Sequence, residues 1–137
     1  METRPTIPEP ESCSRGGIPR RRVLIVDNSA DLARALAGVI DLQDDLESVG
    51  YVSTGAEALG LALDHAADIM VMDLGLADCS GLVILDRLRQ DHPDIKVVVY
   101  SGNGSAEVCD LAKSRGAVGY VRKGDDLDSL LGAIRSA

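Results

Sequence analysis

The sequence predicts a doubly wound α/β domain of three layers, in which a five-stranded parallel sheet lies between two layers of helices. Short apolar runs alternate five times with segments whose apolar residues recur at helical spacing. The links between these segments are short, so successive strands must be joined by helical crossovers. Such crossovers are right-handed and make the strands parallel.

Each element has its own signal. The strands are short apolar runs bounded by turn residues, and the second is more polar and contains Gly50, as edge strands often do. Pro93 stops the third helix because proline cannot continue one. We expect strands over 23–26, 46–52, 68–73, 95–100 and 118–121. A helix follows each strand: the first has Leu32, Leu36, Val39 and Ile40 on one face and Ser29 or Asn28 as its cap, and the second is a short helix around Leu59 and Leu63. The third covers 80–91, the fourth covers 105–115 and ends at Gly116, and the fifth has Leu127, Leu130, Leu131 and Ile134 on one face.

Composition limits the class of protein. The 137 residues suffice for one domain, and aliphatic side chains must fill its core because there are three Tyr, no Phe and no Trp. The net charge is −8, and residues 1–22 hold five Arg against three Glu. The remainder therefore carries about −10, which argues against direct nucleic-acid binding by this part of the chain.

The first 22 residues are rich in proline, glycine and charge, so we expect a flexible leader over 1–22 and the folded domain over 23–137. Arg20–Arg22 is expected to be a solvated flank of the first strand, with a docking patch as the alternative. Cys13, Cys79 and Cys109 are odd in number and widely spaced, which indicates reduced thiols. No signal peptide or membrane span is expected, so the prediction is a soluble cytoplasmic protein.

Chemistry-bearing side chains follow four of the predicted strands. Because the carboxyl ends of parallel strands share one edge of the sheet, these side chains should converge. Carboxylate and amide oxygens suit Mg²⁺, and a hydroxyl and an ammonium can neutralise phosphoryl oxygens. An aspartate at the end of the buried third strand is the predicted nucleophile, which would form an acyl phosphate. The set is Asp27 with Asn28, Asp73 as the nucleophile, Ser101, and Lys123.

This pattern resembles the signature of response-regulator receiver domains of two-component signalling. The resemblance spans about residues 22–136 and implies the flavodoxin-like strand order 2-1-3-4-5, an order taken from the family. The segments 49–59 and 116–124 are most similar to receivers that precede LuxR-type DNA-binding domains, which implies a role in transcription regulation. The matching residues are Asp27, Asp73 with Gly81 eight positions later, Ser101 before a small residue, and Lys123 three positions after Tyr120.

The resemblance implies a phosphorelay. Asp73 would accept a phosphoryl group from a phosphohistidine on a sensor histidine kinase or phosphotransfer protein, with Lys123 pairing its charge. Ser101 would move toward the phosphoryl group and let Tyr120 turn inward. This would shift the surface of the fourth helix, fifth strand and fifth helix, where a second copy or an output partner would bind. The implied Mg²⁺ ligands are Asp27, Asn28, Asp73 and the backbone carbonyl of Gly75.

Three departures from the family pattern matter. Asn28 replaces the usual second carboxylate, which predicts weakened but not abolished Mg²⁺ binding. Leu76-Ala77 replaces a common Met-Pro pair, which predicts a looser loop after Asp73. Gly124 replaces a common proline after the lysine, as is usual in the LuxR-associated subset.

Other functions remain open at this point. A pseudo-receiver would dock a partner without phosphorylation, and Asn28 is its only support. A phosphatase of the haloacid-dehalogenase type would need a second aspartate where Gly75 stands. A flavodoxin-like flavin binder would need a phosphate loop, whereas the segment 27–31 is acidic. Beyond its own phosphorylation and dephosphorylation, we expect no enzymatic activity.

Overall fold

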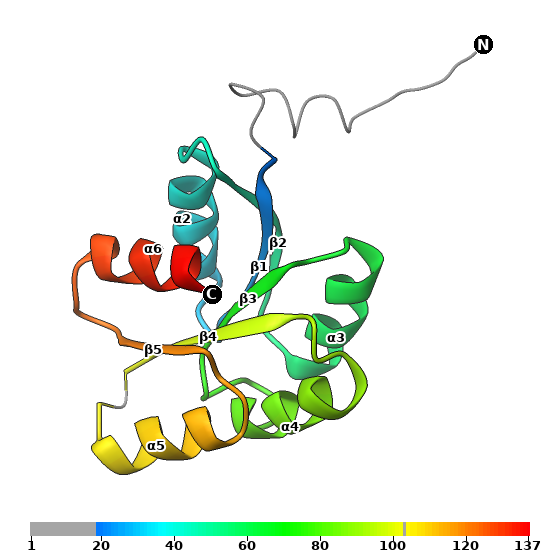
Figure 1. The fold of residues 1–137 in the computed structure, drawn as a ribbon, viewed down its shortest axis with the longest axis vertical. Coiled ribbons are helices and arrows are strands. Elements are labelled where there is room, and N and C mark those ends of the chain that lie inside the picture. Colours follow the sequence, from blue (N-terminus) through cyan, green and yellow to red (C-terminus); the bar gives the residue numbers. More distant parts are fainter. Residues whose placement is uncertain (1–18, 103) are drawn as a thin grey trace.

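The computed structural model describes residues 19–102 and 104–137, which form one five-stranded parallel sheet in the order β2-β1-β3-β4-β5 (Figure 1). This confirms the predicted fold class and strand order. The elements are β1 (Arg21–Val26), α2 (Ala30–Asp41), β2 (Leu46–Val52), α3 (Gly55–Asp64), β3 (Ile69–Met72), α4 (Gly81–Asp91), β4 (Lys96–Ser101), α5 (Ala106–Ser114), β5 (Gly119–Arg122) and α6 (Leu127–Ser136).

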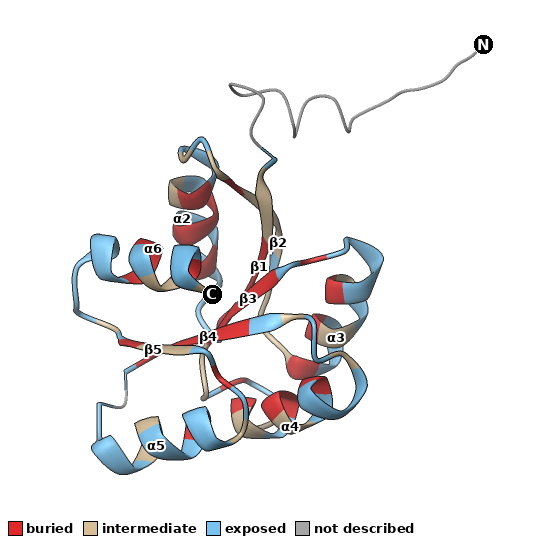
Figure 2. Ribbon diagram, viewed as in Figure 1, coloured by how far each residue is buried: buried red, intermediate tan, exposed pale blue. Residues whose placement is uncertain are grey.

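Helices cover both faces of the sheet, with α2 and α6 on one side and α3, α4 and α5 on the other (Figure 1). Successive strand side chains point to opposite faces, so each central strand feeds two cores. On β1, Val23 and Ile25 join the core beneath α2 and α6, whereas Leu24 and Val26 join the core beneath α3, α4 and α5. Figure 2 shows the resulting burial along the central strands and the inner helix faces.

The sheet has β2 and β5 at its edges. The expectation that the polar second strand lies at an edge is therefore confirmed. The register between β1 and β2 shifts after Val23, where Gly50 in β2 has a φ of 148°. Glycine adopts this conformation without steric cost, which accommodates the irregularity. Strand β1 begins two residues earlier than predicted, and β4 and β5 each begin and end one residue later.

The three consecutive arginines Arg20–Arg22 bind neighbouring elements at the amino end of the sheet. Arg20 donates to the carbonyl of Leu46 at 2.9 Å, and Arg21 donates to the carbonyl of Ile134 in the last turn of α6 at 3.3 Å. Arg22 Nη1 lies 2.8 Å from a carboxylate oxygen of Glu47. The expected solvated flank is wrong in this respect, because these three side chains fix β1 to its neighbours.

Part of the predicted leader, residues 1–18, lies outside the described residues. Among those that are described, no helix has the length and apolarity needed to cross a bilayer.

Helices α3 and α5 end in the same hydrogen-bonded turn, but with different residues at its strained position. In α3 the N–H of Ala67 donates to the carbonyl of Ala62, and in α5 the N–H of Ala117 donates to the carbonyl of Ala112. The residue before this donor is left-handed in both cases. It is Gly116 in α5, with a φ of 114°, but Ala66 in α3, with a φ of 52°.

Substitution at these two positions should have opposite effects on stability. A left-handed conformation costs an L residue about 1–2 kcal/mol, while glycine costs about 0.4–1 kcal/mol in extra unfolded-chain entropy. Ala66→Gly should therefore raise the free energy of unfolding by up to about 1 kcal/mol, and the reverse change Gly116→Ala should lower it by 1 kcal/mol or more. Urea denaturation measures both, and an Ala66→Gly protein no more stable than the wild type would contradict the assignment.

Candidate functional site

Three charged side chains meet at the carboxyl edge of the sheet. The Nζ atom of Lys123 lies 2.9 Å from Oδ2 of Asp27 and 3.1 Å from Oδ2 of Asp73. One ammonium group thus bridges two carboxylates that are 46 positions apart in the sequence. The convergence predicted from the strand ends is present for these three residues.

The strand register brings them together. Val26 of β1 is paired with Met72 of β3, so Asp27 and Asp73 leave adjacent strands at the same level. The N–H of Asp73 donates to the carbonyl of Val26 at 2.8 Å, which continues the ladder to the predicted nucleophile. The fifth strand lies beyond β4, two strands from β3, and its backbone is held where the N–H of Lys123 donates to the carbonyl of Ser101 at 2.8 Å. The flexible lysine side chain then extends past β4 to both acids.

The site is largely removed from water. The side chain of Asp27 is 3% exposed, that of Asp73 13% and that of Lys123 25%. Burial alone would lower the pKa of Lys123, but its hydrogen bonds to Asp27 and Asp73 outweigh burial and raise that pKa above its usual value. With Lys123 protonated and both acids ionised, the three groups carry a net charge of about −1. A buried site with this excess negative charge favours a further cation.

Both carboxylates retain acceptor capacity. Oδ1 of Asp27 accepts from the N–H of Ser29 at 2.8 Å, and Oδ1 of Asp73 accepts from the N–H of Gly75 at 3.2 Å. From residues 19–102 and 104–137, each acid therefore accepts one hydrogen bond per oxygen, counting Lys123, whereas a carboxylate can accept about four in all. The unused lone pairs are available to a metal ion or to a reacting group.

The donor set fits Mg²⁺. This ion is commonly held by one or two carboxylates together with water and phosphate oxygens, and Asp27 and Asp73 supply two. Asn28 follows Asp27 directly and is exposed. Among residues 19–102 and 104–137, no three His, Cys, Asp or Glu side chains cluster as a metal site. Asn28 and the Gly75 carbonyl remain predicted ligands.

Ser101 and Tyr120 lie beside this centre. Ser101 ends β4 and is 4% exposed. Tyr120 on β5 is half-buried against the core beneath α3, α4 and α5. Burial raises the pKa of Tyr120, a hydrogen bond with Ser101 partly opposes this, and the nearby Cys109 and Asp73 raise it slightly further.

The loop between β3 and α4 closes tightly on Asp73. The N–H of Gly81 donates to the carbonyl of Leu74 at 2.7 Å, and Gly75 and Ser80 form an isolated antiparallel bridge. A Cβ atom on Gly81 would lie 2.7 Å from the backbone oxygen of Asp73, so only glycine fits there. The looser loop expected from Leu76-Ala77 stays a prediction.

Sequence reasoning missed one contact of this loop. The carboxylate of Asp78 accepts hydrogen bonds from the backbone N–H groups of Gly55 and Ala56, the first residues of α3. No local pattern could have indicated it, because the donors are backbone groups more than 20 positions away.

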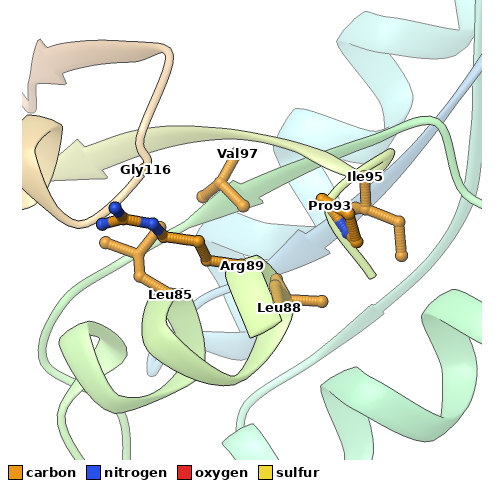
Figure 3. A pocket seen from close by; sticks show the side chains of 7 residues that line it. All are labelled: Leu85, Leu88, Arg89, Pro93, Ile95, Val97 and Gly116. Atoms are coloured by element: carbon orange, nitrogen blue, oxygen red, sulfur yellow. The ribbon is translucent and has the colours of Figure 1, made fainter. Parts of the chain in front are cut away.

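The cavity in Figure 3 is separate from the site. It lies at the amino ends of the strands, between α4, the start of β4 and the end of α5, whereas Asp73 lies at the carboxyl ends. Its only charged side chain, Arg89, already donates to the carbonyl of Ser114 at 2.8 Å. Cys79 and Cys109 are free thiols, as expected, and Cys13 lies outside the described residues.

Comparison with known proteins agrees with this geometry. The family model described as the response regulator receiver domain matches residues 23–135. The nitrate/nitrite response regulator protein NarL of Escherichia coli K12 is 30% identical over 115 residues, which cover 84% of this chain and 53% of NarL. Its homolog in Haemophilus influenzae is 29% identical over 114 residues, covering 83% of this chain and 55% of the relative. The chain thus spans about half the length of the curated relatives it matches.

Solved structures extend the comparison. The response regulator domain of Thermotoga maritima CheB is 29% identical with a TM-score of 0.78, covering 86% of this chain and 96% of that one. A LuxR-family two-component response regulator from Aurantimonas sp. SI85-9A1 is 25% identical with a TM-score of 0.81, covering 85% and 84%. From its sequence and its fold, the chain belongs to the response regulator receiver domains of two-component systems.

Proposed function

We propose that the chain is a phosphorylatable signal receiver that accepts a phosphoryl group on Asp73 from a phosphohistidine of a sensor histidine kinase or phosphotransfer protein. The observation that carries the proposal is the Lys123 ammonium within 3.1 Å of both Asp27 and Asp73. Asp73 provides the nucleophile, Lys123 a positive charge and Asp27 a second carboxylate, all at one point. Family membership adds the class of reaction.

The chemistry is a single displacement at phosphorus. A carboxylate oxygen of Asp73 forms the new O–P bond while the N–P bond of the donor breaks. The electron pair of the N–P bond passes to the imidazole nitrogen, which takes a proton. Lys123 is placed to neutralise charge on the transferred group. Asp27, Asp73 and the predicted ligands Asn28 and Gly75 would hold Mg²⁺, which would supply positive charge to neutralise the phosphoryl oxygens.

Ser101 and Tyr120 provide a route from the site to the surface. A hydroxyl can donate one hydrogen bond and accept two, so Ser101 can contact Tyr120 and a phosphoryl oxygen together. Phosphorylation would then favour one arrangement of these two residues by differential contact. In the proposed switch, Ser101 moves toward the phosphoryl group and Tyr120 turns inward.

The output surface lies on α5, β5 and α6. Three large apolar side chains are exposed along it, with exposed fractions of 39% for Leu111, 49% for Val118 and 42% for Leu127. Apolar exposure of this kind suits a second copy of the chain or an output domain. The curated relatives are about twice as long and include transcriptional regulators, so in this proposal any DNA contact belongs to another domain.

The alternatives are less well supported. A pseudo-receiver has no use for a Lys123 ammonium held between two acids, and Asn28 remains its only argument. A phosphatase would need an aspartate at position 75, where the chain has glycine. A flavin-binding protein would need a phosphate-binding loop after β1, which the sequence does not have.

Phosphorylation of Asp73 is tested by intact-mass measurement. Wild-type protein incubated with Mg²⁺ and phosphoramidate should gain the mass of one phosphoryl group, and Asp73→Asn should gain none because the amide is not a nucleophile. Asp68→Asn is the matched control, since Asp68 precedes the opposite end of β3, and it should behave as the wild type. A wild-type protein that takes no phosphoryl group, or an Asp73→Asn protein that does, would contradict the proposal and favour the docking module.

The effect of Asn28 is tested by calorimetric Mg²⁺ titration. Unit charges 4 Å apart interact by roughly 4 kcal/mol at an effective dielectric near 20, and exposure to water reduces this. Asn28→Asp should therefore tighten Mg²⁺ binding by about tenfold or more, which corresponds to about 1.4 kcal/mol. Gln43→Glu adds the same charge beyond the far end of α2 and should leave the affinity unchanged. Equal affinities for the wild type and Asn28→Asp would rule out Asn28 as a ligand.

A further inference from the structure

The loop that follows Asp73 is fastened to a helix on the same side of the sheet. Oδ1 of Asp78 accepts from the N–H of Gly55 at 2.8 Å, and Oδ2 accepts from the N–H of Ala56 at 3.1 Å. Both oxygens of one carboxylate are thus directed at the first two residues of α3. The N–H of Ala77 also faces the carbonyl of Ser53, at 3.5 Å.

The attachment point is rigid and electrostatically suited to a carboxylate. The first N–H groups of a helix have no partner within it and carry partial positive charge. The Gly55 hydrogen bond lowers the pKa of Asp78, burial opposes this slightly, and the Ala56 bond lowers it further, so the group is ionised at neutral pH. Gly55 itself is buried, and a Cβ atom there would lie 2.7 Å from Sγ of Cys79. The loop therefore packs against α3 without space for a side chain between them.

The same loop carries part of the reaction centre. Its first residues include Gly75, whose N–H donates to Asp73 at 3.2 Å. At the other end of the loop, Ser80 forms a bridge with Gly75. Gly81, which begins α4, leaves no space for a Cβ atom beside the backbone oxygen of Asp73. A displacement of Asp78 would reach Asp73 through this short, closed path.

We propose that Asp78 is a positioning residue for phosphoryl transfer at Asp73, which holds the 74–80 loop on the first turn of α3 and so fixes the backbone around Gly75. This loop has Ala77 where the family often has proline, and the Asp78 carboxylate supplies an alternative restraint. The inference rests on the proposed function, because it assigns Asp78 a part in that reaction.

Asp78 must be distinguished from an ordinary helix cap. Helix α3 has its own cap, since Oγ1 of Thr54 accepts from the N–H of Glu57 at 3.3 Å. Thr54→Ala removes an acceptor from the same helix end without altering the 74–80 loop, which makes it the matched control. Loss of either acceptor should lower the urea concentration at the midpoint of unfolding by a similar amount.

The experiment compares wild type, Asp78→Ala, Asp78→Asn and Thr54→Ala. Hydrogen exchange of the 74–81 amides reports loop opening independently of reactivity. The rate of phosphoryl adduct formation from phosphoramidate, measured by intact mass, reports positioning. Asp78→Ala should accelerate exchange of these amides and slow adduct formation by about tenfold, because small displacements at a reacting centre are costly. Asp78→Asn keeps one acceptor oxygen and should fall between Asp78→Ala and the wild type, while Thr54→Ala should match the wild type in both measurements.

Each other result has a definite meaning. If Asp78→Ala phosphorylates as fast as a reactive wild type, or if Thr54→Ala slows the reaction equally, Asp78 is a structural cap and the inference is wrong. If exchange of the loop amides is unchanged in Asp78→Ala, the carboxylate does not hold the loop and the inference is also wrong. A wild type that forms no adduct refutes the proposed function, and the inference that rests on it, whatever the variants do.

Discussion

The Lys123 ammonium between Asp27 and Asp73 is the interaction on which the site depends. Neither acid is near the lysine in sequence, and each would be costly to bury without a compensating charge. They meet because three strands of one parallel sheet release them at the same edge, in a register that pairs Val26 with Met72. The aliphatic cores on both faces of the sheet are what maintain that register. The packing of the domain therefore holds the Lys123 ammonium beside the two carboxylates.

The fold could be predicted from the sequence because its signals are local and repeated. Five apolar runs, the helical spacing after each and the short links are sufficient to specify a parallel α/β sheet. The strand order required the family resemblance, since periodicity does not say which strands are neighbours. The convergence of Asp27, Asp73 and Lys123 followed from one general property, that parallel strands end at a common edge.

The parts that could not be predicted depend on contacts that side chains make with groups far away in the sequence. Arg20, Arg21 and Arg22 looked like a solvated run, yet they bind the carbonyl groups of Leu46 and Ile134 and the carboxylate of Glu47. The loop after Asp73 lacks the proline that is common in the family, but the Asp78 carboxylate holds this loop on α3. A side chain that accepts from backbone N–H groups leaves no pattern in the sequence of either partner, because every residue except proline has that group.

The central claim is that Asp73 is the phosphoacceptor and that Lys123 neutralises the charge of the incoming group. A crystal structure of the chain with Mg²⁺ and the phosphomimetic beryllofluoride tests both parts at once. The account predicts beryllofluoride on a carboxylate oxygen of Asp73, with Nζ of Lys123 within hydrogen-bonding distance of a fluoride and the cation between Asp27 and Asp73. Beryllofluoride absent from Asp73 in crystals grown at saturating concentration, with Lys123 still bridging the two carboxylates, would contradict it.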